Sequence, residues 1–160
     1  MRVATADLSD AHPDAAIAEP GLLDFGGREA FSGFIRTVRC FEDNSLVRAV
    51  LEGQGDGAVL VVDGGGSRSC ALLGDRLGAL AIVNGWSGVI VNGCVRDAAE
   101  LRRMELGVRA LAAHPRRSLK RGEGDQDVPV SFLGVDFVPG FWVYVDADGA
   151  LVLPERAAED

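Results

Sequence analysis

The sequence of 160 residues lacks any apolar stretch near the roughly 18–20 residues that a membrane-spanning helix needs. It also lacks the apolar core of a signal peptide, because Asp7, Asp10, Asp14 and Glu19 stand where that core would lie. From these two absences we expect neither a helical membrane anchor nor an ordinary secretory leader. They predict a cytoplasmic protein that makes no contact with membranes.

Cysteine and histidine are scarce, with three and two residues respectively. Cys40, Cys70 and Cys94 are odd in number, and no two of them have the CxxC spacing that is typical of zinc sites. We therefore expect buried, reduced thiols rather than disulfides or zinc ligands. His12 and His114 are far apart and near no obvious nucleophile, so a structural role is expected for His114.

Positive charge is in short supply, since the formal net charge is −8 and the pI is about 4.7. Such a surface repels phosphate backbones and disfavours direct nucleic-acid binding as the main activity. The one basic run, residues 114–121 (HPRRSLKR), is followed at once by acidic residues and is predicted to be a solvated loop, with a partner contact as the alternative. The remaining composition, 48 % hydrophobic and 25 % charged, is that of a globular chain, and we expect one domain over residues 1–160.

Hydrophobic patterning predicts alternating strands and helices in the centre of the chain. Residues 58–62 (AVLVV) form a continuous apolar run, as in a strand that is buried on both faces. Residues 1–20 are polar with helix-forming pieces, expected to pack across the outside, and Asn44 or Ser45 is the expected cap of the first central helix. The predicted strands are 31–40, 58–62, 88–91 and 108–113, and the predicted helices are 42–52, 75–84 and 97–105. This alternation is the signature of right-handed βαβ units and a parallel sheet.

The C-terminal third has a different pattern, with short apolar runs separated by hairpin signals. The runs are 128–132, 135–138, 141–145 and 150–153, and the breaks contain Gly134, Pro139-Gly140 and Asp148-Gly149. We expect an α/β fold with a parallel central sheet, covering helices, and a second, largely antiparallel sheet.

Two predicted helices begin at Asp75 and Asp97, each just after an apolar strand. If both strands belong to one parallel sheet, both helix starts open at the same edge, where α/β proteins bind ligands. The amides of residues 75–77 suit a small carboxylate, and the guanidinium of Arg96 can grip a carboxylate at two points. Asp97 offers a hard oxygen ligand for Mg²⁺ or Mn²⁺. The pattern predicts a site for a small 2-oxo acid chelated by a divalent metal.

A purely structural interpretation is the alternative. Asp97-Ala-Ala-Glu100 is also a capping-box pattern, in which Asp97 caps the helix and Glu100 reaches back. Asp75 is likewise a good residue for a helix start. This interpretation explains both aspartates, but it gives no reason for the arginine, Arg96, directly before the second cap.

The glycine-rich segment 63–67 (DGGGS) follows a strand and could be compared with a nucleotide- or methyl-donor-binding loop. Its glycines do not have the GxGxxG spacing, and the next strand ends on Asn92 rather than on an acidic residue. A turn that lets backbones pack closely is the preferred interpretation. Cys94 lies near Arg96, either lining the site or buried and inert.

Five motifs in order resemble the RraA-like family, over about residues 5 to 153. They are 61–67 (VVDGGGS), 71–75 (ALLGD), 92–97 (NGCVRD), 114–118 (HPRRS) and 120–124 (KRGEG). The family contains the regulators of ribonuclease E activity A and the class II 4-hydroxy-4-methyl-2-oxoglutarate aldolases. The resemblance implies a swivelling β/β/α fold, assembled as a homotrimer with sites in clefts between subunits.

The aldolases of this family carry an Asp or Gly, twenty intervening residues and then Arg-Asp, which Asp75 and Arg96-Asp97 match. Glu100 matches the acidic residue that follows. By this resemblance Asp97 holds the divalent metal, and substrate is held by Gly74, Asp75, Arg76, Leu77 and Arg96. Our own candidate for proton transfer is Asp75, directly or through a water.

The expected activity is that of a metal-dependent lyase that cleaves small 2-oxo acids through a pyruvate enolate. Cleavage of 4-hydroxy-4-methyl-2-oxoglutarate and decarboxylation of oxaloacetate both fit this chemistry. The alternative is a non-catalytic protein that binds and inhibits ribonuclease E or regulates another partner. Family members that only bind tend to lack the aspartate after the arginine, whereas this chain keeps Asp97. Two departures are Arg68-Ser69, where the family has Leu-Arg, and Phe141, where it has Asp.

Overall fold

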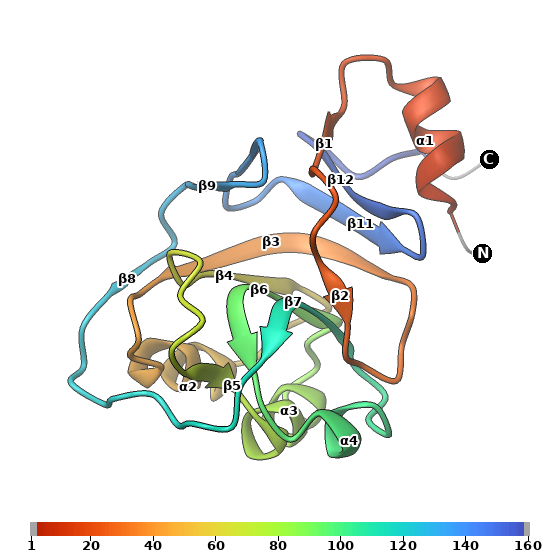
Figure 1. Ribbon diagram of the computed structural model, residues 1–160. Coiled ribbons are helices and arrows are strands. Elements are labelled where there is room, and N and C mark those ends of the chain that lie inside the picture. The colour runs from red at the N-terminus through yellow and green to blue at the C-terminus, as the bar shows by residue number, and fades with distance from the viewer. Residues whose placement is uncertain (1–2, 159–160) are drawn as a thin grey trace.

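The computed structural model describes residues 3–158, so the two residues at each end of the expected 1–160 domain lie outside the described part. Figure 1 shows three helices, α2, α3 and α4, on one face of a central sheet, and an antiparallel hairpin with α1 beside it on the other. The helices are α1 (Thr5–Ala11), α2 (Ser45–Leu51), α3 (Asp75–Val83) and α4 (Ala98–Leu101). The strands are β1 (Ala16–Ile17), β2 (Leu23–Asp24), β3 (Phe31–Arg39), β4 (Val59–Asp63), β5 (Ala71–Leu73), β6 (Gly88–Val95), β7 (Gly107–Ala113), β8 (Asp125–Gln126), β9 (Val130–Phe132), β10 (Val135–Phe137), β11 (Trp142–Asp146) and β12 (Gly149–Leu153). The predicted α/β class is confirmed.

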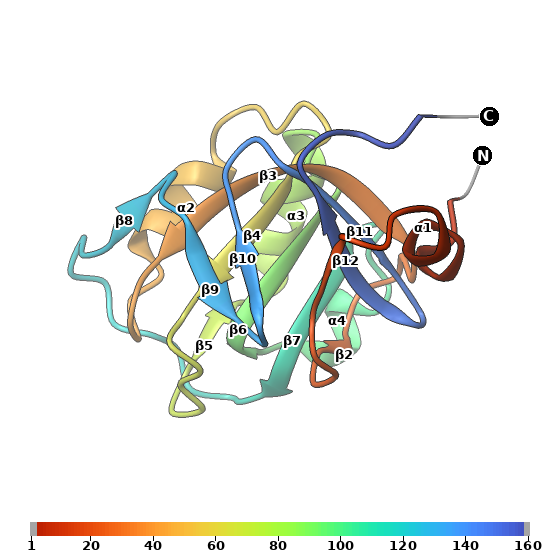
Figure 2. The ribbon, with the colours of Figure 1, turned by 90° about the horizontal axis from the view of Figure 1, so that it is seen from above.

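The central sheet is parallel and is joined to the antiparallel part along one strand. β3, β4, β6 and β7 pair in parallel in that order, as the predicted βαβ units require. The other edge of β3 pairs antiparallel with β11, which in turn pairs with β12, so the sheet curls over itself (Figure 2). A separate two-stranded sheet, β9–β10, makes the hairpin predicted at Gly134.

Successive residues of the central strands point into two different cores, because side chains alternate along a strand. Leu60 and Val62 of β4 pack against the helices, whereas Val59 and Val61 pack against the antiparallel layer. All four side chains are fully buried. Each contributes about 1.5–3 kcal/mol relative to an exposed position, which explains why this strand has no polar alternation.

Strand β6 is longer than predicted, and β5 was not predicted at all. Asn92-Gly93 has the composition of a turn, so the predicted strand ended at Val91, yet the Asn92 side chain donates to Asp63 on the neighbouring strand at 2.9 Å. β6 then continues past a register shift to Val95, and its second half pairs with the three residues of β5. A strand of three residues has too little pattern to be found in the sequence.

The helix after Asp97 is shorter than the predicted 97–105, because it tightens into a turn after Leu101. The amides of Arg103 and Met104 bond to carbonyls three residues back, and the carbonyl of Met104 accepts a bond from Gly27. Asn44 stands at the N-cap position of α2, one of the two predicted positions, but its side chain makes no cap bond there. Within residues 3–158, none of the helices has the length and apolarity that spanning a membrane would require.

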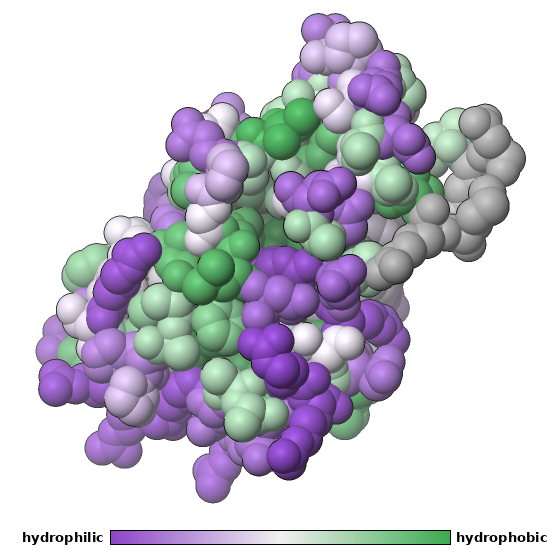
Figure 3. Space-filling view, turned by 45° about the vertical axis from the view of Figure 1, so that its right-hand side comes forward, coloured by the Kyte–Doolittle hydropathy of each residue, from purple (hydrophilic) through white to green (hydrophobic). Residues whose placement is uncertain are grey.

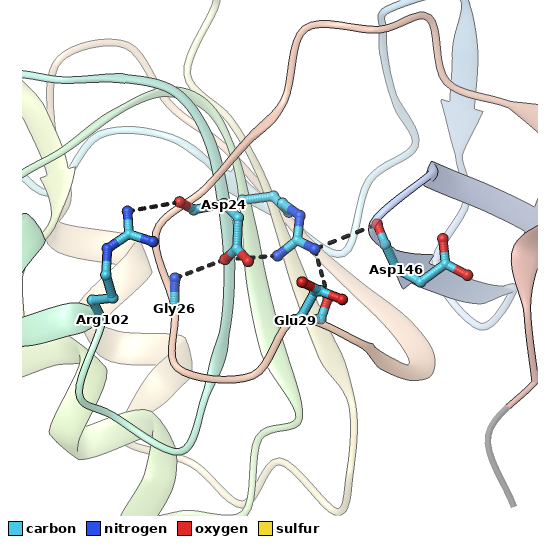
Figure 4. A network of polar contacts seen from close by, with 6 residues as sticks. Asp24, Gly26, Glu29, Arg102 and Asp146 are labelled. Atoms are coloured by element: carbon cyan, nitrogen blue, oxygen red, sulfur yellow. Dashed lines mark hydrogen bonds and ion pairs between the residues drawn. The ribbon is translucent and has the colours of Figure 1, made fainter.

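A buried arginine on β7 holds the edge of the sheet together. Arg109 is 4 % exposed, and its Nη1 forms an ion pair with Asp24 of β2 at 2.9 Å. Its Nη2 donates to the backbone carbonyls of Glu29 and, at 3.4 Å, of Asp146. Figure 4 shows these partners converging from separate segments, with Asp24 also accepting the Gly26 amide. Arg109 thereby links three chain segments, because it pairs with polar groups of Asp24, Glu29 and Asp146 that lie beside the sheet edge.

A buried aspartate fixes the basic loop 114–124 against the start of α2. Asp43 is 2 % exposed; its Oδ1 accepts bonds from the amide and hydroxyl of Ser45, and its Oδ2 from the amides of Arg121 and Glu123. Burial alone would raise the pKa of Asp43, but these hydrogen bonds outweigh it and lower the pKa to about 2. The carboxylate, rather than a cap from Asn44 or Ser45, thus organises the helix start.

We predict that Asp43→Asn lowers the free energy of unfolding at pH 7 by about 2–3 kcal/mol, because an amide cannot accept all four bonds. A lowered pKa stabilises the fold above the ordinary value of 3.8, and that stability disappears as pH falls towards 2. The difference between wild type and variant in urea unfolding should therefore shrink between pH 5 and pH 2. Asp125→Asn, at an exposed ion pair with Arg39, is the control and should cost under about 1 kcal/mol. Equal losses in the two variants would contradict this role of Asp43.

Candidate active site

The ends of β5 and β6 meet at one edge of the sheet. The backbone amide of Arg96, just after β6, donates to the carbonyl of Leu73 at the end of β5, at 2.9 Å. The amide of Asp75, the first residue of α3, then donates to Oδ2 of Asp97 at 3.0 Å. Asp75, Arg96 and Asp97 therefore lie together, as the parallel topology predicts.

The Asp97 side chain does not cap its own helix, so the capping-box interpretation is wrong. No side-chain cap bond is made at the start of α4, and Glu100 lies near Arg103, at 3.8 Å, instead of reaching back. Asp97 has a φ of 57°, a left-handed conformation that costs an L residue about 1–3 kcal/mol. This conformation turns its carboxylate towards α3.

Gly74 is what allows the Asp97 carboxylate to lie over the start of α3. A Cβ atom at this position would be 2.7 Å from Oδ2 of Asp97 and 3.3 Å from Cγ of Arg96. The glycine backbone is in an ordinary extended conformation, so the requirement is for space and not for a special φ. Any larger residue would push Arg96 and Asp97 away from Asp75.

A polar cavity of about 530 Å³ opens at this edge and contains all of the predicted site residues. Five basic side chains and two carboxylates line it, which is unusual in a chain of net charge −8. Such a positively charged cleft attracts small anions. The lining residues are Asn44, Arg48, Ala71, Leu73, Gly74, Asp75, Arg76, Leu77, Arg96, Asp97, Arg117, Ser118 and Lys120.

Several donors in the cavity are open. The guanidinium groups of Arg76, Arg96 and Arg117 make no hydrogen bond or ion pair with any residue from 3 to 158. Nor do the amides of Arg76 and Leu77, in the first turn of α3, find an acceptor in that part of the chain. Helix N-termini favour negative charge, and together with Arg96 these amides could hold a carboxylate from two sides.

The carboxylates fit a hydrated divalent metal better than a closed metal centre. Asp97 uses Oδ2 for the Asp75 amide and keeps Oδ1 open, and the Asp75 carboxylate has no partner between residues 3 and 158. No group of three or more His, Cys, Asp or Glu side chains within the described chain could hold an ion. One hard oxygen ligand with water and ligand oxygens completing the shell suits Mg²⁺ or Mn²⁺, and it does not suit structural zinc.

The sequence analysis missed the second wall of the cavity. Arg117, Ser118 and Lys120 belong to the run predicted as a solvated loop, and Arg48 and Asn44 come from α2. Most of the run is indeed exposed. Its placement depends on Asp43, which nothing in the sequence pattern identifies as buried.

Other residues singled out in the sequence lie outside the cavity lining. Arg68 and Cys94 are not among the lining residues, and Phe141 packs in the antiparallel layer. The three cysteines are free and buried as predicted. Burial, helped by Asp43 and Asp63, raises the pKa of Cys40 to about 12, which makes that thiol inert.

The glycine-rich turn 63–67 is closed on itself. The amides of Gly64 and Gly66 donate to the carbonyl of Asn92, and the amide of Gly65 donates to the side chain of Asp63. These donors are therefore not available to a phosphate or a cofactor, which agrees with the interpretation as a packing turn.

Comparison with known proteins identifies the relatives of this chain. A family model described as RraA-like, Aldolase/RraA, matches residues 5–152. The "Putative 4-hydroxy-4-methyl-2-oxoglutarate aldolase" of Deinococcus radiodurans is 60 % identical over 151 residues, 94 % of each chain. The RNA-processing inhibitor RraA from Thermus thermophilus has a TM-score of 0.96 at 50 % identity, covering 99 % of this chain and 96 % of that one. A structure from Geobacillus kaustophilus, described as an S-adenosylmethionine:2-dimethylmenaquinone methyltransferase, has a TM-score of 0.95 at 48 % identity, covering 96 % of each. The chain therefore belongs to the RraA-like family.

Proposed function

We propose that this protein is a divalent-metal-dependent lyase for small 2-oxo acids. It would cleave 4-hydroxy-4-methyl-2-oxoglutarate and decarboxylate oxaloacetate, both through a pyruvate enolate. One observation carries the proposal: the hydrogen bond from the Asp75 amide to Asp97 gathers two carboxylates, Arg96 and the open start of α3 at one wall of a basic cavity. The name of the Deinococcus radiodurans relative supports the aldolase half of this assignment.

The binding roles follow from the open groups. Arg96 and the amides of Arg76 and Leu77 would hold the substrate carboxylate next to the 2-oxo group, with the backbone brought close by Gly74. Asp97 would hold Mg²⁺ or Mn²⁺ through its open oxygen. The bound metal supplies Lewis-acid stabilisation of the negative charge that develops on the 2-oxo oxygen.

Asp75 is the candidate for proton transfer, because its carboxylate is in the cavity and has no partner in residues 3–158. In the aldol cleavage Asp75, directly or through one water, would take the proton of the C4 hydroxyl. The C3–C4 bond then breaks, C4 becomes a carbonyl, and the electron pair passes into the enolate. Return of a proton to C3 gives pyruvate. In oxaloacetate the same bond breaks with loss of carbon dioxide, and only the second proton transfer is needed.

The metal site is tested by Asp97→Asn. An amide oxygen can still accept the Asp75 N–H, so the free energy of unfolding should change by about 1 kcal/mol or less. Turnover of oxaloacetate with Mg²⁺ or Mn²⁺ should fall by about a hundredfold or more, because a neutral amide is a poor ligand for a hard cation. Glu105→Gln, which alters an exposed carboxylate outside the cavity lining, is the control. A fully active Asp97→Asn variant would remove the metal from this position.

The carboxylate grip is tested by Arg96→Lys, since a lysine cannot make a planar two-point contact. The Michaelis constant for oxaloacetate should rise and turnover should fall. Oxalate, a planar dianion similar to the enolate, should inhibit the wild type competitively and the variant at least tenfold less well. Unchanged inhibition by oxalate would mean that Arg96 does not touch the carboxylate.

A second candidate function is binding of a protein partner, favoured by the similarity to the RNA-processing inhibitor RraA from Thermus thermophilus. A non-catalytic regulator of ribonuclease E would not need Arg96. Its partner should then bind the Arg96→Lys variant normally, and the wild type should show no turnover with magnesium, manganese or cobalt. Metal-dependent turnover by the wild type would decide in favour of the lyase.

We further propose that the chain assembles as a homotrimer, as its family resemblance implies. Figure 3 shows a face on which apolar side chains gather between polar ones, a pattern that often marks an interface. The described chain exposes several large apolar residues, namely Ile17, Leu23, Phe41, Ile82, Val83 and Leu119.

Light scattering should therefore give a mass of about three times 16.8 kDa. The same measurement on the Arg96→Lys variant should give the same mass, because that side chain acts on substrate. A stable and fully active monomer would exclude a site shared between subunits.

A further inference from the structure

A second hollow of the molecule, of about 430 Å³, has no part in the proposed lyase chemistry. It lies between strand β2 and the turn that joins β11 to β12. Arg109 is the one basic residue that the structure places in its lining, and this side chain is already paired with Asp24. The acidic residues of the lining are Glu19, Asp24, Glu29, Asp146 and Asp148. This acidic hollow therefore has a negative potential that attracts cations.

Three carboxylates of the acidic hollow are exposed and unpaired. The side chains of Glu19, Glu29 and Asp148 make no hydrogen bond or ion pair with any residue from 3 to 158. Leu23, which lies in the same lining, keeps 54 % of its surface exposed. An exposed leucine among open carboxylates suits a segment that presents an apolar side chain between cations.

The loop between β7 and β8 presents this complementary pattern. Leu119 is 53 % exposed, and Lys120 and Arg121 follow it directly. The guanidinium groups of Arg116 and Arg121 make no hydrogen bond or ion pair within the described part of the chain, and neither residue lines the active-site cavity. These two arginines are therefore open to a partner other than the substrate.

The exposed leucine is held in a fixed position. The amide of Leu119 donates to the carbonyl of Glu42 at 2.9 Å, and the amide of Arg121 donates to Oδ2 of Asp43 at 2.7 Å. Because the backbone is already ordered on both sides of Lys120, a partner that binds this loop loses little free energy to ordering it.

The acidic hollow and the basic loop cannot meet within one chain. Figures 1 and 2 show the loop before β8 on one side of the molecule, and the turn between β11 and β12 on the opposite side. A second copy of the chain can bring the two surfaces together. Because each copy carries a net charge of −8, copies repel one another unless unlike charges face each other at the contact.

We propose that residues 119–121 of one copy bind in the acidic hollow of the next copy. Leu119 packs against Leu23 of the next copy, and Arg121 lies among the open carboxylates. The contact joins two different surfaces, so its repetition generates a closed ring. It also anchors the second wall of the active-site cavity, because Arg117 and Lys120 belong to the same loop. The inference rests on the homotrimer proposed above and names the surfaces that join its subunits.

The test reverses one charge on each surface of the whole protein, with Arg121→Glu and Asp148→Arg. Each single variant places like charges opposite each other and should raise the dissociation constant of the oligomer by about tenfold or more. Light scattering over a dilution series should then show a mass that falls from about three times 16.8 kDa towards that of one chain. The double variant Arg121→Glu/Asp148→Arg should regain most of the lost mass, since unlike charges face each other again.

Asp10→Lys is the matched control, because it reverses an exposed charge on α1 outside the acidic hollow, and it should leave the mass unchanged. A trimer that persists in both single variants, or a loss that the double variant does not reverse, would overturn this contact and leave the homotrimer standing. A monomeric wild type would overturn both the contact and the homotrimer. Restored assembly in the double variant would support the contact even in a protein without lyase turnover.

Discussion

The hydrogen bond between the Asp75 amide and the Asp97 carboxylate is the contact on which the rest of the site depends. It joins the starts of two helices that belong to separate βα units, and it is possible only because Gly74 has no side chain. It also requires the left-handed backbone of Asp97, which would be unfavourable without a compensating interaction. The bond fixes one carboxylate oxygen and leaves the other open. A structural cap would have used the carboxylate within its own helix, and this geometry instead directs it into a cavity.

The cavity lining is basic, although the chain as a whole is acidic. Overall the chain carries −8, yet the cleft gathers basic side chains from α2, α3, the end of β6 and the loop after β7. The loop reaches the cleft because a buried carboxylate, Asp43, satisfies its backbone amides. Acidic and basic residues around the cleft therefore differ in what they bind. Asp43 accepts hydrogen bonds from backbone amides, whereas the guanidinium groups of Arg76, Arg96 and Arg117 make no bond within residues 3–158 and can bind anions.

Residues that form long, periodic segments made the fold predictable. The run 58–62 marked a strand buried on both faces, and the Gly134 and Asp148-Gly149 signals marked hairpins that the structure contains. The closeness of Asp75 and Asp97 followed from topology alone. The sequence could not reveal β5, because three residues carry no period, nor the continuation of β6 through Asn92-Gly93, because a side-chain bond to Asp63 overrides the turn tendency. The wall formed by Arg117 and Ser118 was hidden for the same reason, since a distant carboxylate places it.

Relatives with one fold carry names as different as an aldolase, a methyltransferase and an RNA-processing inhibitor. The fold therefore cannot decide the function, and only side chains at the site can. A methyl-donor site would need backbone donors free to bind a cofactor, but the glycine turn 63–67 uses its amides internally. A pure binding module would not by itself require a residue without a side chain at Gly74 or a left-handed backbone at Asp97. Both features are explained if two carboxylates and an arginine must converge on one small anion, as a reaction at this site would require.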